Sequence, residues 1–153
     1  MKKFIIGMLF MTIIISGIPV MAEGNAKTME SKVISLVNSE RSKRRLPVLK
    51  TNIKLGKTAR IKAEDMRNKN YFSHISPTYG SPFNMMQRFG ISFTAAGENI
   101  AKGQRTPAEV MKSWMNSPGH RQNILNPAYT DIGVGFAKDA RGVTYWVQQF
   151  IRR

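Results

Sequence analysis

The chain has 153 residues, with 24 Lys and Arg against nine Asp and Glu, which gives a formal net charge of +15. This length suits a single domain, and a hydrophobic content of 42% with 22% charged residues is typical of a globular protein rather than a disordered one. The sequence contains no cysteine, which excludes disulfides, Cys-ligated zinc, iron–sulfur clusters, thiol nucleophiles and a lipid anchor attached through cysteine.

The first 22 residues are predicted to be a secretory signal peptide. Lys2 and Lys3 precede an apolar stretch over residues 4–20, and Ala22 closes a small-residue cleavage site. A retained membrane anchor is the alternative, although this stretch is at the short end of the range for a span. Cleavage after Ala22 would remove two lysines, which lowers the net charge from +15 to +13. It would leave no membrane span, and we expect a secreted protein that associates with the cell wall.

The first half of the mature chain is predicted to be mainly helical. Residues 23–28 are typical of a flexible lead-in, and apolar residues at helical spacing over 29–44 predict the first helix. Thr51 or Asn52 is expected to cap a second helix that runs to about residue 70. We expect this second helix to turn its alanines and large apolar residues inward and its lysines and arginines outward.

Helices and strands are predicted to alternate after a turn-rich loop over residues 71–81. A short helix over 82–89 is expected first, followed by a strand around 97–101. A capping box predicts the next helix over 107–116, because a threonine precedes its first residue and a glutamate follows three positions later. A Ser-Pro-Gly break should end that helix before one more helical turn over 120–125.

The last part of the chain is predicted to form an antiparallel strand pair. Apolar residues alternate with small or polar ones over residues 132–137 and again over 143–148. Gly133 and Gly135 are interpreted as positions of close packing, since no third glycine completes a dinucleotide-binding loop. Helices flanking a small, mostly antiparallel sheet predict an α+β fold with three α/β/α layers.

Two histidines and one glutamate are the candidate functional residues. His74 and His120 each lie among turn residues, where functional side chains concentrate, and Glu98 lies between them in the sequence. Together they could hold a divalent metal such as zinc with open positions, or exchange protons as an acid–base pair. Alternatively, each histidine only caps a turn. Their spacing matches no compact metal-binding motif.

Five segments form a specific pattern that covers residues 29–152. They are NSER at 38–41, YFSH at 71–74, GENI at 97–100, WMNSPGHRQNIL at 114–125 and IGVGF at 132–136. In this order they resemble the CAP superfamily of cysteine-rich secretory, antigen 5 and pathogenesis-related proteins, also called SCP-like extracellular proteins. The similarity is to the compact bacterial branch, because the disulfides and the cysteine-rich extension of eukaryotic members are missing.

The resemblance implies an α/β/α sandwich over the domain at 29–153, with a cleft lined by two histidines and two acidic residues. His74 and His120 match the two histidine positions, and Glu98 matches the first acidic position. Ser117 occupies the position of the second acidic residue. Because a hydroxyl is a weaker metal ligand than a carboxylate, the resemblance implies at most weak zinc binding by the other three residues.

Three functions remain open at this point. The first is a non-catalytic binding module of the cell envelope, whose cleft and basic surface engage an anionic polymer, a lipid or an envelope protein. For it we expect a monomer without specific nucleic-acid binding. The second is a metal-assisted hydrolase of peptides or esters, in which His74 and His120 hold the ion and Glu98 is a ligand or base. The third is a structural component of the wall or spore coat.

The basic cluster at residues 41–45 also has two interpretations. Cations are favourable at a helix C-terminus, which would make the cluster a local stabilising feature. The same five residues could instead form a patch for an anionic polymer.

Overall fold

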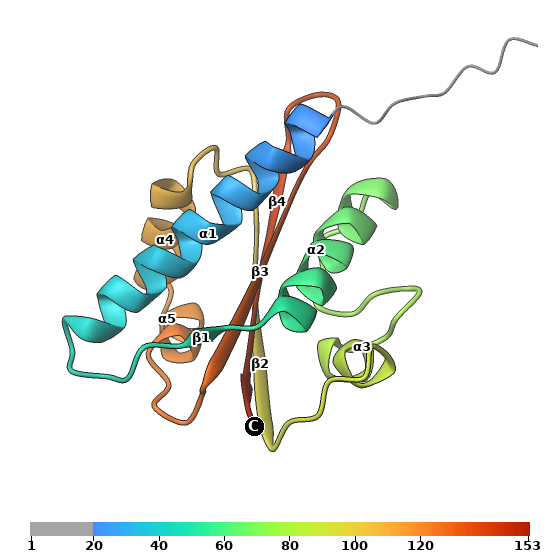
Figure 1. The fold of residues 1–153 in the computed structure, drawn as a ribbon. Helices are drawn as coiled ribbons and strands as arrows, with labels where there is room; N and C mark the ends of the chain where they lie inside the picture. Colours follow the sequence, from blue (N-terminus) through green and yellow to red (C-terminus); the bar gives the residue numbers. More distant parts are fainter. Residues whose placement is uncertain (1–19) are drawn as a thin grey trace, which may run out of the picture.

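The computed structural model describes residues 20–153, and Figure 1 traces the fold. The elements in chain order are α1 (Val20–Ser42), β1 (Lys50–Thr51), α2 (Ile53–Asn68), α3 (Pro82–Arg88), β2 (Ala95–Lys102), α4 (Pro107–Asn116), α5 (Pro118–Ile124), β3 (Asp131–Lys138) and β4 (Thr144–Arg152). Most of the predicted signal peptide lies outside the described residues and stays a prediction. Within the described part, none of the helices has the length and apolar character needed to cross a membrane.

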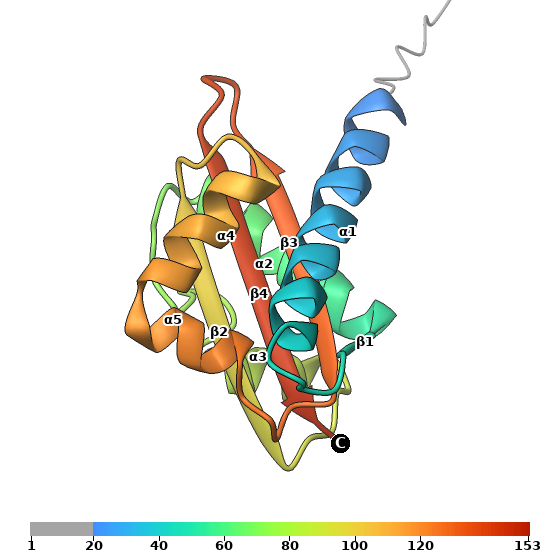
Figure 2. The same ribbon diagram turned by 90° about the vertical axis from the view of Figure 1, so that its left-hand side faces the viewer.

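The four strands form one sheet in the order β1-β3-β4-β2, so β2 lies at an edge. The pairs β3–β4 and β2–β4 are antiparallel, and the short β1 is parallel to β3. Helices α2 and α3 cover one face of the sheet, and α1, α4 and α5 cover the other (Figures 1 and 2). The predicted α+β class and the three-layer arrangement are therefore confirmed, and the sheet is mostly antiparallel as expected.

Helix α2 packs directly on the backbone of β3. A Cβ atom added at Gly133 would lie 2.3 Å from the Gly56 nitrogen, and one added at Gly135 would lie 2.2 Å from the Ala59 carbonyl carbon. Real side chains cannot occupy such space, so only glycine permits this approach. The interpretation of these two glycines as sites of close packing is confirmed, and it explains why α2 is held firmly enough to position other groups.

The N-terminal helix begins earlier than predicted. Residues 23–28 lie within α1 rather than in a flexible lead-in, which corrects that prediction. The Thr28 hydroxyl donates to the Gly24 carbonyl at 2.9 Å, as expected in a continuous helix. Ala26 and Met29 also pack against the main hydrophobic cluster, so the segment has a tertiary reason to be ordered.

One predicted helix cap is confirmed, and one further helix boundary differs from prediction. Of the two expected caps of α2, Asn52 is the one used, because its side-chain oxygen accepts the Leu55 amide at 3.1 Å. Helix α5 begins at Pro118 rather than at His120. Proline is favoured at the first position of a helix, where no amide donor is needed, so the predicted break is instead a helix start.

Candidate functional site

The edge strand β2 connects both candidate histidines. Alternate residues of a strand point to opposite faces of the sheet. Glu98 points to the face covered by α2, where its carboxylate meets the His74 ring. The next residue, Asn99, points to the other face, and its amide donates to the His120 carbonyl oxygen at 3.0 Å. Two consecutive strand residues therefore hold the segments that carry His74 and His120.

The contact between His74 and Glu98 is direct. His74 Nδ1 lies 2.9 Å from Glu98 Oε1, and the Gln149 amide donates to Glu98 Oε2 at 2.9 Å. Gln149 can do so because it lies opposite Glu98 in the β2–β4 register. The Glu98 side chain is 1% exposed, whereas the His74 side chain is 48% exposed. Both carboxylate oxygens are thus engaged from within, and His74 is the part of the pair that faces solvent.

Helix α2 fixes the loop that carries His74. The Lys62 ammonium donates to the His74 carbonyl oxygen at 2.6 Å. One turn further on, the Asp65 carboxylate accepts hydrogen bonds from the Tyr71 hydroxyl at 2.5 Å and the Ser76 hydroxyl at 2.7 Å. Burial and the hydrogen bond to Asp65 raise the pKa of Tyr71, so its hydroxyl remains a donor. The loop is therefore fastened before, at and after His74.

His120 lies near the start of α5 and is partly buried. Burial lowers the pKa of His120, and the charge on His74 lowers it further. The structure therefore brings His74 into contact with Glu98, whereas His120 is linked to β2 through the hydrogen bond from Asn99 to its carbonyl oxygen.

Ser117 does not add a charged group to this site. It ends α4 and also precedes α5, where its side chain makes no capping hydrogen bond. Over the residues that the structure describes, no three His, Cys, Asp or Glu side chains are arranged to hold a metal ion. The trio of His74, Glu98 and His120 therefore does not fit a ready-made metal centre, and zinc binding remains a sequence-based prediction.

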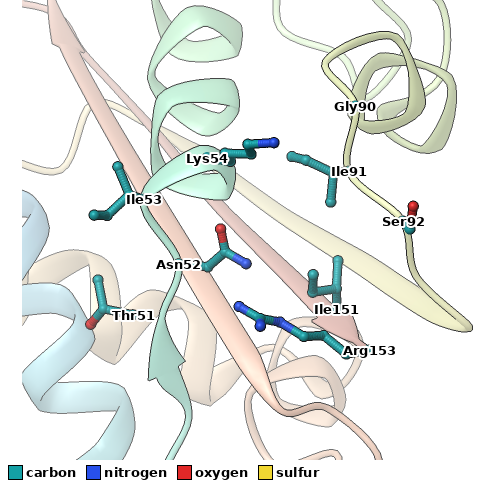
Figure 3. Close-up of a pocket in the computed structure, with 9 residues that line it drawn as sticks. All are labelled: Thr51, Asn52, Ile53, Lys54, Gly90, Ile91, Ser92, Ile151 and Arg153. Atoms are coloured by element: carbon teal, nitrogen blue, oxygen red, sulfur yellow. The ribbon is translucent and has the colours of Figure 1, made fainter.

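A separate surface pocket lies at the N-terminal end of α2 (Figure 3). It has a volume of about 510 Å³ and is lined by residues from the end of β1, the start of α2, the segment after α3 and the C-terminal end of β4, together with Arg153. Lys54 and Arg153 contribute positive charge there, but Arg153 is paired with Asp131 at 2.7 Å. None of the candidate histidines or Glu98 lines this pocket, so it is distinct from the site around β2.

Sequence reasoning misses two residues of the site. Lys62 is fully buried, although lysines of the second helix are predicted to face outward. Lys62 lies three residues after Ala59 and four before Met66, which places it on the buried face of α2. The helical periodicity of the sequence could therefore have predicted its burial. Gln149 is also fully buried, and only the pairing register of β2 with β4 shows that it meets Glu98.

Comparison with known proteins agrees with this architecture. The cysteine-rich secretory protein family, CAP, matches residues 34–150, so the chain belongs to this family. The Bacillus subtilis protein YkwD, which is described as uncharacterized, is 56% identical over 130 residues, covering 85% of this chain and 49% of YkwD. The chain thus spans about half the length of this relative.

Two solved structures share the fold. An extracellular protein containing an SCP domain from Bacillus anthracis has a TM-score of 0.82 and 35% identity, over 88% of this chain and 44% of that one. An outer surface protein from Borrelia burgdorferi has a TM-score of 0.74 and 24% identity, over 79% and 90% of the two chains. The second similarity shows the fold alone. The similarity to YkwD and to the SCP-domain protein of Bacillus anthracis confirms the bacterial branch that the sequence pattern indicates.

The depressed pKa of His120 predicts a pH dependence of stability. The unfolded chain binds a proton near the ordinary value of 6.5, while folded His120 binds it at lower pH. Between these values the unfolded state holds more protons, so the free energy of unfolding should fall as the pH is lowered below 6.5. Asp65 and Asp131 titrate below 3.8 and do not act in this range.

Urea unfolding of the wild type and His120→Gln, followed at several pH values from neutral to mildly acidic, measures this contribution. The variant should show a shallower loss of stability on acidification. An identical slope in the two proteins would contradict the assignment to His120.

Proposed function

We propose that this protein is a secreted, non-catalytic binding module that acts at the cell envelope. The observation that carries the proposal is the state of Glu98. Its carboxylate is buried and both of its oxygens are engaged, one by His74 and the other by Gln149. A general base must reach the proton that it removes, and a buried carboxylate that is held by His74 and Gln149 is poorly placed to contact a substrate or its attacking water. The hydrolase hypothesis therefore has no geometric support from Glu98.

The charge of the chain supports the envelope as the place of action. A formal net charge of +13 after removal of the predicted signal peptide attracts anionic wall polymers and lipid head groups. The similarity to an extracellular SCP-domain protein of Bacillus anthracis supports secretion. The exposed His74 ring and the neighbouring exposed side chains Phe72 and Ile75 would supply a specific contact beside this general attraction.

Retention on purified bacterial cell wall that contains teichoic acid tests the electrostatic part. The protein should be retained at low ionic strength and eluted by salt, because exposed charges are screened beyond about 10 Å at 0.1 M. The double variant Lys112→Glu and Arg121→Glu, at two exposed positions on α4 and α5, should elute at markedly lower salt.

The matched control exchanges the same two positions without changing charge, as Lys112→Arg and Arg121→Lys, and should elute with the wild type. Retention that persists in high salt, or that ignores the charge reversal, would count against the proposal. Soluble fragments released from the wall by the wild type, but not by His74→Ala, would favour the hydrolase instead.

A further inference from the structure

Lys62 is a buried cation beside the candidate site. Its side chain is fully buried, although lysines are almost never fully buried unless they are paired. The ammonium donates to the His74 carbonyl oxygen at 2.6 Å and lies 5.6 Å from the centroid of the Tyr71 ring. These contacts hold the charge at the base of the loop that presents His74.

Two carboxylates on different elements act electrostatically on this ammonium. Glu98 on β2 and Asp65 on α2 each favour the charged form of Lys62, while burial opposes it and lowers its pKa overall. The Asp65 carboxylate already forms an ion pair with Lys69 at 3.0 Å and accepts hydrogen bonds from two hydroxyl groups. Glu98, in contrast, has a neutral amide and an imidazole as its hydrogen-bond partners. Lys62 is therefore the buried basic side chain that acts on Glu98 from within.

We propose that Lys62 is the resident cation of this site, supplying to Glu98 the positive charge that a metal ion would otherwise supply and repelling divalent cations from His74 and Glu98. Coulomb repulsion between a buried ammonium and a divalent ion is weakly screened, so a metal beside Glu98 would be opposed by Lys62. Ser117 contributes no negative charge to offset this repulsion. The described residues also lack a three-ligand arrangement, which agrees with a site built without metal.

The inference concerns the charge of the site and does not depend on the envelope role. It predicts which ligands the site around His74 accepts, because a site with its own cation has no need of a second one. Neutral or anionic groups are then the chemical class that the exposed His74 ring would meet, and divalent cations are disfavoured.

Titration of the purified protein with Zn²⁺ alone, followed by calorimetry, tests the proposal. Lys62→Gln removes the charge but keeps an N–H donor for the His74 carbonyl. This variant should bind Zn²⁺ at least about tenfold more tightly than the wild type, because the repulsion is gone. Adding His74→Ala to Lys62→Gln should abolish the gain, and Lys62→Arg, which keeps the charge, should behave as the wild type.

A folded Lys62→Gln variant whose zinc affinity equals that of the wild type would overturn the proposal. Circular dichroism establishes whether the variant is folded, and Lys62→Met offers a second neutral side chain of similar length. The wild type provides an independent test. Zinc binding tighter than about 0.1 mM that is lost in His74→Ala, detected as a stabilising thermal shift, would also overturn it.

Discussion

Replacing Arg41 by methionine is expected to lower the free energy of unfolding by about 4 kcal/mol. Arg41 is fully buried, and its Nε donates to the Pro47 carbonyl at 2.9 Å. Its Nη1 donates to the carbonyls of Ile124 at 2.9 Å and Asn126 at 2.8 Å. Methionine fills similar space without a donor, so three acceptors lose their partner, and each buried one costs about 1–3 kcal/mol. Urea unfolding followed by circular dichroism measures the loss.

Arg44→Met is the matched control for this substitution. Arg44 is exposed and bonds to Glu40 one turn earlier, through the Glu40 carboxylate and carbonyl. Exposed pairs of this kind contribute about 0.2–1 kcal/mol, so the control should differ little from the wild type. Equal losses for the two variants would show that Arg41 acts only as a surface charge. Arg41→Lys should fall between them, because one ammonium cannot replace the planar fork that reaches three carbonyls.

The contrast between Arg41 and Arg44 shows where sequence reasoning stops. The cluster at residues 41–45 predicts either helix-end cations or a patch for anionic polymers. Arg41 does lie in the last turn of α1, but neither prediction includes its burial. Lys43 and Arg44 do pair with Glu40 at the end of α1. Arg41 is buried because the end of α5 lies against it, and its partner Ile124 is 83 positions away in the sequence. A contact between residues so far apart in the sequence leaves no recognisable pattern in the residues around either one.

The order and type of most elements can be predicted, because they depend on local periodicity and turn chemistry. The capping threonine of α4 is a clear case, since the Thr106 hydroxyl accepts the Glu109 amide at 3.2 Å. The start of α5 is harder to predict, because the proline before His120 is equally compatible with a helix break and with a first helical position. Only the packing of α5 beside α4 decides between the two.

The candidate site can be predicted only in part. The family pattern places His74 and Glu98 in one cleft, and the structure brings these residues, 24 positions apart in the sequence, to 2.9 Å in space. The pattern does not include the residues that surround this pair. The positive charge of Lys62 predicts an exposed position on its helix. Gln149 is indistinguishable in the sequence from any other polar residue of a strand. Their roles follow from the position of α2 over the sheet and from the β2–β4 register, which are tertiary features.

Gly135→Ala is expected to lower the free energy of unfolding by about 3 kcal/mol or more. The added Cβ would lie 2.2 Å from both the Ala59 carbonyl carbon and the Arg60 nitrogen, which are backbone atoms that cannot rotate away. Helix α2 would have to move off β3. Because α2 carries Lys62 and Asp65, this movement should also disturb the loop around His74. Urea unfolding measures the first effect, and the NMR resonances of the His74 ring report the second.

Gly119→Ala is the control, since nothing lies within 4 Å of an added Cβ at that position in α5. Its stability should stay within about 0.5 kcal/mol of the wild type, because the change touches no packed surface. If Gly135→Ala had the same urea midpoint of unfolding as the wild type, this would contradict the close packing of α2 on β3. If it lost stability but kept the wild-type His74 resonances, the loop would be held independently of α2, and the hydrogen bond from Lys62 to His74 would not be what fixes it.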